Sequence, residues 1–293
     1  MSEFLHYIII GIVQGVAEFL PISSSGHLVI FGDLLDMGAE DMTLEILVHL
    51  GTLIAVFFAY RQDVLSLLKA IPSVPQFISS TKRQELSDET QDNCRLGLFI
   101  IASMFPAAVI GLSFKDQLEQ ARSLYLVGFS LLFTAVILFS IKFSKEKSDK
   151  LNLQKVIFIG FAQAVSVLPG VSRSGTTICM ALWLGLKREE AARFSFLMSI
   201  PVILGASIIK IGEMFGRSYS STQLIQYAVA MISAAVVGYL CIVLIKKLVT
   251  QNRFHYFGFY CISIALVCLL YFAPQSAKKK AATQQQTIEL KHP

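Results

Sequence analysis

Charged side chains are scarce in this 293-residue chain. Aspartate, glutamate, lysine and arginine together make up 15% of it, compared with roughly 25% in an ordinary soluble domain. Hydrophobic residues make up 54%, and the mean hydropathy is +0.63. A soluble fold of this size could not bury so much apolar surface, so we expect an all-α, polytopic membrane protein whose solvent is lipid.

Two other classes of protein are disfavoured by what the sequence lacks. The net charge is only +5, and no basic stripe is interleaved with aromatic residues, so nucleic acid is not an expected partner. The cysteines show no CxxC spacing, and four of the five lie in apolar stretches. We therefore expect buried, apolar cysteines and neither a disulfide framework nor a zinc site. They are Cys94, Cys179, Cys241, Cys261 and Cys268.

Six apolar stretches are long enough, or nearly so, to cross a bilayer, which takes about 20 apolar residues. Polar connections separate them, and the longest connection is predicted at 61–95. The tail at 278–293 is polar and glutamine-rich, so we expect it to be disordered and residues 1–277 to form a single domain. The six stretches are 46–60, 96–114, 123–141, 194–209, 218–245 and 254–277.

Two further apolar pairs are too short and too interrupted to be simple spans. Stretches 4–17 and 19–32 flank Glu18 and a Pro/Ser/Gly run, and stretches 156–172 and 174–186 flank Arg173. Such matched pairs are typical of discontinuous or re-entrant helices. Non-helical backbone at membrane depth is tolerated only where it is buried in protein or lines a cavity, so both breaks are expected to face a site.

The two broken pairs are also related to each other. When residues 11–27 are shifted by 149, six of seventeen positions coincide without a gap. This indicates an internal repeat, which in membrane proteins is often inverted and brings both broken segments together near the midplane. The coinciding pairs are Gly11/Gly160, Gln14/Gln163, Val16/Val165, Ser23/Ser172, Ser25/Ser174 and Gly26/Gly175.

Polar residues of the first broken pair favour a catalytic site. Gln14 and Glu18 are four residues apart and so share a helix face, and a carboxylate in an apolar segment needs a partner or a cavity. His27 can act as a general acid or base near neutral pH. Each residue also has a structural explanation, since glutamate can snorkel, serine can cap a helix and histidine can be satisfied in a core. Their combination favours function, together with the hydroxyls and tight turn of Ser23, Ser24, Ser25 and Gly26.

Arg173 is the strongest single signal in the second broken pair. Its planar guanidinium suits a phosphate or a carboxylate. An ion pair with Glu18 is the structural alternative, and it is compatible with anion binding, because the pair could hold the empty site. His49 is a weaker signal that fits a core histidine as well as a supporting group. Hydroxyls and helix-start N–H groups that could bind phosphate come from Ser172, Ser174, Gly175 and Thr176.

These motifs resemble the undecaprenyl-diphosphate phosphatase family of bacteria, also known as bacitracin-resistance proteins. The family motif (E/Q)xxxE is matched at 14–18 and continues to 27, and the motif PGxSRSG is matched at 169–175. Similarity extends to 49–53 and 190–196, and it covers nearly the whole chain from Ile9 to about Phe272. Gln14 stands where many members have glutamate, which makes a metal site of two carboxylates less secure.

The resemblance implies the architecture of the chain and its place in the cell. It implies six transmembrane helices plus two re-entrant helix–loop–helix units in an inverted repeat, with halves at about 1–122 and 123–277. It also implies a multi-pass protein of the bacterial plasma (inner) membrane, with the site facing the periplasm or outer side.

The resemblance further implies an activity. A polyprenyl diphosphate lipid would be hydrolysed to undecaprenyl phosphate and inorganic phosphate, which recycles the carrier lipid for peptidoglycan synthesis and confers bacitracin resistance. A divalent cation, Mg²⁺ or Ca²⁺, is implied as cofactor, with Gln14 and Glu18 as its candidate ligands. Membrane lipids are further partners, and a homodimer is left open.

The chemistry expected from these residues is phosphoryl transfer, in which positioning and charge stabilisation dominate. Ser24 is the predicted nucleophile, Glu18 or His27 would take its proton, and Arg173 would neutralise the phosphate. His27 or a metal-bound water as the attacking group stays open. The rival function is a polyprenyl-phosphate flippase or secondary transporter, because inverted repeats of broken helices are also transporter architecture.

Overall fold

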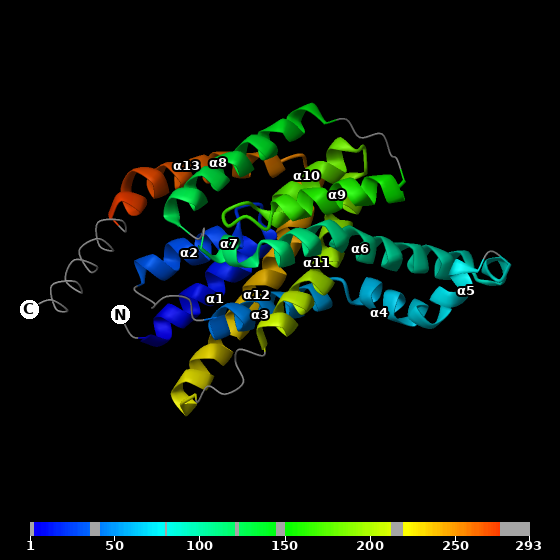
Figure 1. The fold of residues 1–293 in the computed structure, drawn as a ribbon, viewed down its shortest axis with the longest axis horizontal. Coiled ribbons are helices and arrows are strands. Elements are labelled where there is room, and N and C mark those ends of the chain that lie inside the picture. Colours follow the sequence, from blue (N-terminus) through cyan, green and yellow to red (C-terminus); the bar gives the residue numbers. More distant parts are fainter. Residues whose placement is uncertain are drawn as a thin grey trace, which may run out of the picture.

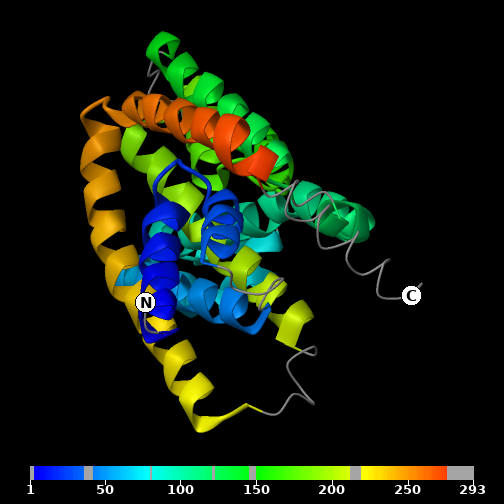
Figure 2. The same cartoon turned by 90° about the vertical axis from the view of Figure 1, so that its left-hand side faces the viewer.

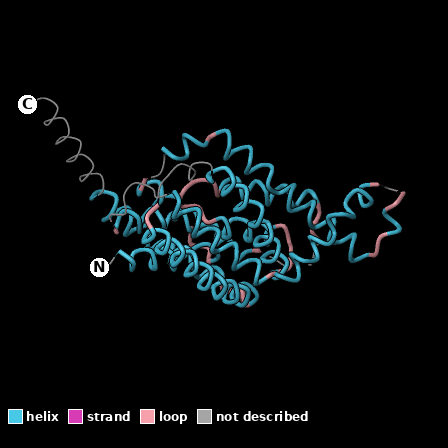
Figure 3. The backbone as a smooth tube through the Cα atoms, turned by 90° about the horizontal axis from the view of Figure 1, so that it is seen from below, coloured by secondary structure: helices cyan, strands magenta, loops and turns pink. Residues whose placement is uncertain are grey.

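The computed structural model describes residues 3–35, 42–79, 81–120, 123–144, 150–211 and 219–275. Within these ranges every regular element is a helix and there is no strand, as predicted (Figure 3). Single 3₁₀ or π turns η1–η5 lie at Ile71–Ser73, Arg83–Glu85, Ile141–Phe143, Phe254–Tyr256 and Cys268–Phe272. The α-helices are α1 (Glu3–Phe19), α2 (Ser24–Leu34), α3 (Met42–Ala59), α4 (Arg61–Ala70), α5 (Val74–Ile78), α6 (Asp88–Ser113), α7 (Lys115–Gln120), α8 (Leu124–Ser140), α9 (Leu153–Val165), α10 (Arg173–Trp183), α11 (Arg188–Ile211), α12 (Ser221–Thr250) and α13 (Phe257–Val267).

Five helical segments of the described chain are long and apolar enough to cross a membrane. A sixth span is formed if Thr43–Ala59 and Arg61–Ile78, which meet at an angle of 86°, are taken together. These segments coincide with the six stretches expected from the sequence, so the chain is a multi-pass membrane protein. The five are Asp88–Ser113, Leu124–Phe143, Arg188–Ile209, Ser221–Thr250 and Phe254–Gln275.

The prediction that 61–95 is a long polar connection is wrong, because the segment forms helices. Most of its described residues are helical, because α4 and α5 bury one face against the first turns of α6, where Ala70, Phe77 and Cys94 form a small apolar cluster. Figure 1 shows these helices projecting together at one end of the molecule. Helix α6 begins at Asp88, before the predicted stretch at 96–114. Ser87 caps this start, and its hydroxyl accepts from the Thr90 N–H at 3.3 Å.

Helices α1 and α2, and helices α9 and α10, form the two predicted helix–loop–helix units. Helices α2 and α10 each contain 11 residues and begin at Ser24 and Arg173, which are 149 positions apart. The shift read from the sequence therefore relates equivalent positions in the two units. The wider halves at 1–122 and 123–277 stay a prediction, and the tail at 278–293 lies outside the described residues.

Small residues let helix α1 and helix α3 pack closely against the long helix α12 (Figure 1 and Figure 2). A Cβ on Gly15 of α1 would lie 2.8 Å from the Ala234 carbonyl oxygen of α12, so only glycine fits at this contact. Close approach at glycine is a common basis of helix association in membranes, where lipid provides no hydrophobic drive between helices. This packing fixes α1, which carries Gln14 and Glu18.

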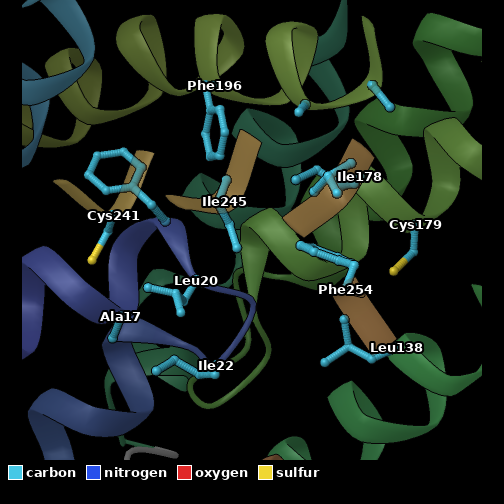
Figure 4. Close-up of a cluster of buried hydrophobic side chains, with 14 of the residues drawn as sticks. Ala17, Leu20, Ile22, Leu138, Ile178, Cys179, Phe196, Cys241, Ile245 and Phe254 are labelled. Carbon is cyan, nitrogen blue, oxygen red and sulfur yellow. The ribbon is translucent and has the colours of Figure 1, made fainter. Parts of the chain in front are cut away.

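The loop of the first unit is embedded in the apolar core. Figure 4 shows Leu20 and Ile22 in the same buried cluster as Ile178 of α10, Phe196 of α11 and Ile245 of α12. All five cysteines are buried and free, as predicted. Burial of the loop within protein satisfies the condition for non-helical backbone at membrane depth, and it holds the start of α2 against the start of α10.

Candidate active site

Equivalent serines build the same cap in both loops. The Ser23 hydroxyl accepts from the Gly26 N–H at 3.2 Å, and the Ser172 hydroxyl accepts from the Gly175 N–H at 3.1 Å. Each serine also lies 3.3 Å, oxygen to oxygen, from the hydroxyl two residues later, Ser25 or Ser174. The shared serines and glycines therefore shape the loops, and the two caps stabilise the first turns of α2 and α10.

The two loops also bind each other directly. The Gly170 N–H donates to the Ser25 hydroxyl at 3.3 Å, and the Ser174 hydroxyl donates to the Leu20 carbonyl at 3.2 Å. Gly170 has a φ of +93°, a left-handed conformation that favours glycine. These contacts place the N-terminal ends of α2 and α10 close together. Helix N-termini carry partial positive charge and suit an anion.

Glu18 is the centre of the polar network between the loops. Its Oε1 accepts from Nη2 of Arg173 at 2.5 Å, and its Oε2 accepts from the Ser24 hydroxyl at 2.7 Å and from Nε2 of Gln14 at 3.0 Å. The Arg173 guanidinium also donates from Nη1 to the Ser195 carbonyl at 3.3 Å. The structure thus brings four residues predicted from the sequence into one site and confirms the Glu18–Arg173 ion pair.

The members of this network differ in their access to the exterior. Gln14 and Glu18 are buried, whereas Ser24 and Arg173 are partly exposed. A molecule entering the site would therefore meet the Ser24 hydroxyl and the guanidinium first, with the carboxylate behind them. A hydroxyl that donates to a carboxylate is poised to lose its proton as it attacks, and the neighbouring guanidinium suits the charge of a phosphoryl group.

His27 lies apart from this network. Its Nδ1 lies 2.9 Å from the Ser23 carbonyl oxygen and its Nε2 lies 2.8 Å from the Tyr260 hydroxyl. Among the described residues these are its side-chain hydrogen bonds, and neither Ser24 nor Glu18 is a partner. The expected direct exchange of a proton between His27 and Ser24 therefore has no hydrogen bond to carry it in this conformation, because the ring is turned toward α13.

Thr176 was expected to bind phosphate, but its hydroxyl is turned back into its own helix. It donates to the carbonyls of Ser172 and Arg173 at 3.0 and 3.1 Å, and the residue is buried. The hydroxyl of the next residue, Thr177, also donates to the Arg173 carbonyl at 2.7 Å, and it lies 2.7 Å from the Ser195 hydroxyl. Thr177 and Ser195 thus brace the helix start that carries Arg173, a role that the sequence pattern did not single out.

His49 joins the site more closely than the sequence indicated. Its Nε2 lies 3.8 Å from Oε2 of Glu18, while its Nδ1 lies 2.7 Å from the Glu45 carbonyl oxygen. Its side chain is 25% exposed, whereas that of Glu18 is 7% exposed. The signal for this residue was a histidine within an apolar stretch, which alone did not distinguish a site residue from a core residue.

The oxygen atoms near Glu18 allow a limited test for a divalent cation. In the described chain there is no group of three or more His, Cys, Asp and Glu side chains that could hold a metal. Oε1 of Gln14 is buried and has no hydrogen-bond partner among the described residues, while Nε2 of the same amide donates to Glu18. Mg²⁺ commonly takes one or two carboxylates and completes its shell with water and substrate phosphate. Gln14 and Glu18 stay the candidate ligands for a cation that would arrive with a phosphorylated ligand.

The fold and the site together define a multi-pass membrane protein with a serine, a carboxylate and an arginine at the junction of two broken helix pairs. The family model described as bacitracin resistance protein BacA matches residues 7–267. The chain belongs to this family.

Curated relatives of the family agree over most of the chain. The undecaprenyl-diphosphatase of Rubrobacter xylanophilus is 38% identical over 272 residues, which is 90% of this chain and 97% of that protein. Undecaprenyl-diphosphatase 1 of Bacillus cereus is 35% identical over 277 residues, which is 92% of this chain and 100% of that protein. The undecaprenyl-diphosphatase of Rhodopirellula baltica is 38% identical over 277 residues, covering 92% and 98%.

Proposed function

We propose that this protein is an undecaprenyl-diphosphate phosphatase, which hydrolyses the phosphoric anhydride bond to give undecaprenyl phosphate and inorganic phosphate. The observation that carries the proposal is the Ser24 hydroxyl, which is hydrogen-bonded to Glu18 at 2.7 Å while Arg173 binds the other carboxylate oxygen. The names of the relatives support the same substrate.

In the first chemical step, Ser24 Oγ attacks the terminal phosphorus. Its proton passes to Glu18 Oε2, the bond from the terminal phosphorus to the bridging oxygen breaks, and undecaprenyl phosphate leaves. Arg173 and the N-terminal N–H groups of α2 and α10 stabilise the charge on the transferring group. The catalytic serine stands at the first position of α2, so the positive end of that helix faces the phosphoryl group.

In the second step, water attacks the phosphoserine. Glu18 returns the proton that it took to the Ser24 oxygen and accepts the proton of the incoming water, and inorganic phosphate leaves. Ser23, Ser25, Ser172 and Ser174 maintain the two loops throughout. A divalent cation held by Gln14, Glu18 and the substrate would supply further charge neutralisation.

The biological setting follows from the substrate. Hydrolysis would regenerate the carrier lipid for peptidoglycan synthesis, and removal of the diphosphate would give resistance to bacitracin. We place the protein in the plasma (inner) membrane with the site open to the periplasmic or outer side, in contact with membrane lipids. A homodimer is a further proposal that measurement of the mass in detergent would test.

A flippase or secondary transporter is the rival that the sequence left open. Broken helix pairs suit both functions. The relatives' names favour the phosphatase. A serine held by a carboxylate also has an evident role in phosphoryl transfer and none in moving a lipid.

The decisive experiment measures phosphate release from a polyprenyl diphosphate by the purified protein in detergent, without an ion gradient, with and without EDTA. We expect turnover by the wild type and a loss of several orders of magnitude in Ser24→Ala. Mass spectrometry of the protein after a rapid acid quench should detect phosphate on Ser24. Near-normal turnover by Ser24→Ala would overturn the serine nucleophile, and an inactive wild type would overturn the phosphatase itself.

A further inference from the structure

His27 is held between the first loop and the last helix of the described chain. Its two ring nitrogens lie at hydrogen-bond distance from the Ser23 carbonyl and the Tyr260 hydroxyl, and 233 residues separate His27 from Tyr260. The imidazole and the tyrosine ring are also stacked, with centroids 5.7 Å apart and an interplanar angle of 12°. The tyrosine therefore fixes both the orientation of the ring and the use of one nitrogen.

The contact between α13 and the first loop is repeated at the next residue. The Cys261 thiol donates to the Pro21 carbonyl at 3.5 Å. Two successive residues of α13 thus bind the first loop, at Pro21, and the first turn of α2, at His27, and both Cys261 and His27 are buried. These two contacts make α13 a support for the segment around Ser24.

The partners of His27 determine its tautomer. The Ser23 carbonyl can only accept, so Nδ1 must carry the hydrogen. In the neutral ring Nε2 is then an acceptor, and the Tyr260 hydroxyl donates to it. The tyrosine is 40% exposed whereas His27 is 4% exposed, so this hydrogen bond joins a buried ring to a partly exposed one.

We propose that Tyr260 is a positioning residue for the active site, which acts through His27. Its hydroxyl holds His27 as the Nδ1–H tautomer, and His27 in turn binds the backbone of Ser23, the residue that caps α2 directly before Ser24. Ser23 has a φ of +71°, so its peptide occupies a conformation that needs such support. The inference rests on the proposed function, since its kinetic consequence is the placement of the Ser24 nucleophile.

The test combines Tyr260→Phe, which removes only the hydroxyl, with nitrogen-15 NMR of histidine-labelled full-length protein in detergent. Signals of His27 are assigned by their loss in His27→Gln. We expect the wild type to show a single Nδ1–H tautomer of His27 and Tyr260→Phe to show a mixture. We also expect kcat to fall about tenfold with KM within twofold, the effect of one hydrogen bond lost away from the substrate.

Tyr271→Phe is the matched control, because Tyr271 follows in the same terminal helical run and its side chain is exposed. It should leave both the His27 signals and kcat unchanged. A wild-type His27 with hydrogen on Nε2 would overturn the inference whether or not the variant folds. Unchanged tautomer and kcat in a folded Tyr260→Phe protein would do the same. An inactive wild type with the expected tautomer would count against the phosphatase and leave the Tyr260–His27 assignment supported.

Discussion

Arg173 donates from Nη2 to Oε1 of Glu18 at 2.5 Å, although 155 residues of sequence separate the two side chains. The side chains are only 15% and 7% exposed, respectively. Glu18 belongs to α1, the first helix of the first broken unit. Arg173 begins α10, the second helix of the second broken unit. This ion pair therefore joins the two units, so the same two charges that form the site also hold the units together.

Removal of one partner of this pair should be more damaging than removal of both charges. Arg173→Ala leaves the buried Glu18 carboxylate uncompensated, which typically costs about 3–5 kcal/mol. We expect a clear drop in the apparent melting temperature in detergent, and partial recovery in the double variant Glu18→Gln/Arg173→Ala. Phosphate release should stay abolished in both. Recovery of turnover together with melting temperature would show that the pair is structural only.

Gln14→Glu tests the cation site. Nε2 of Gln14 donates to Glu18 at 3.0 Å, so a carboxylate there would place two acceptors of like charge side by side. We expect a lower melting temperature without cation and an apparent Mg²⁺ affinity raised about tenfold, because a second carboxylate both repels Glu18 and binds the ion. Phosphate release measured against free Mg²⁺ gives the second quantity.

Gln163→Glu provides the control for that change. Gln163 is the equivalent residue of the second unit and is equally buried, but Val167 stands at the position that corresponds to Glu18. Its substitution should leave the Mg²⁺ dependence of turnover as it is in the wild type. A Gln14→Glu protein with wild-type Mg²⁺ dependence would contradict a cation at Gln14 and Glu18.

The spans of this fold could be predicted because their signal is local. A run of about 20 apolar residues suffices to indicate a membrane helix, and most described residues of all six stretches are helical. The segment at 61–95 was mistaken for a connection because its mixed charges hide an amphipathic pattern. Its few buried residues pack together where α4 and α5 contact the start of α6, and composition alone does not reveal that contact.

Part of the site could also be predicted from local sequence. Glu18, Ser24 and Arg173 were predicted because polar groups in broken apolar helices are costly without a function. The direction of His27 was not predictable, since it depends on Tyr260, a residue on a distant apolar helix that no motif marks. The direction of the Thr176 hydroxyl was not predictable either. It donates to the backbone of its own helix, a choice that the motif does not reveal.

His49→Gln should lower kcat/KM about tenfold or more. Nε2 of His49 lies 3.8 Å from Oε2 of Glu18, and the side chain is 25% exposed, so the imidazole is placed to offer a hydrogen bond to the carboxylate or to an incoming phosphate. His6→Gln is a suitable control, because His6 precedes Glu18 by twelve residues on α1, about 18 Å along the helix. Equal turnover of the two variants would remove His49 from the site.

Gly170→Ala should damage the enzyme through the backbone of the second loop. Gly170 has a φ of +93°, and a Cβ there would come within 2.7 Å of the Ser130 side chain and 2.9 Å of the Val127 backbone. Strain and overpacking of this kind cost about 1–3 kcal/mol, and the shift would move the Gly170–Ser25 contact that joins the loops. We expect a lower melting temperature and at least a tenfold loss of turnover. Gly205→Ala, at a helical position where, apart from its chain neighbours and its own helix backbone, no atom of the described residues would lie within 4 Å of a Cβ, should change neither. A Gly170→Ala protein as active as Gly205→Ala would show that the close fit of the two loops is not required for phosphate release.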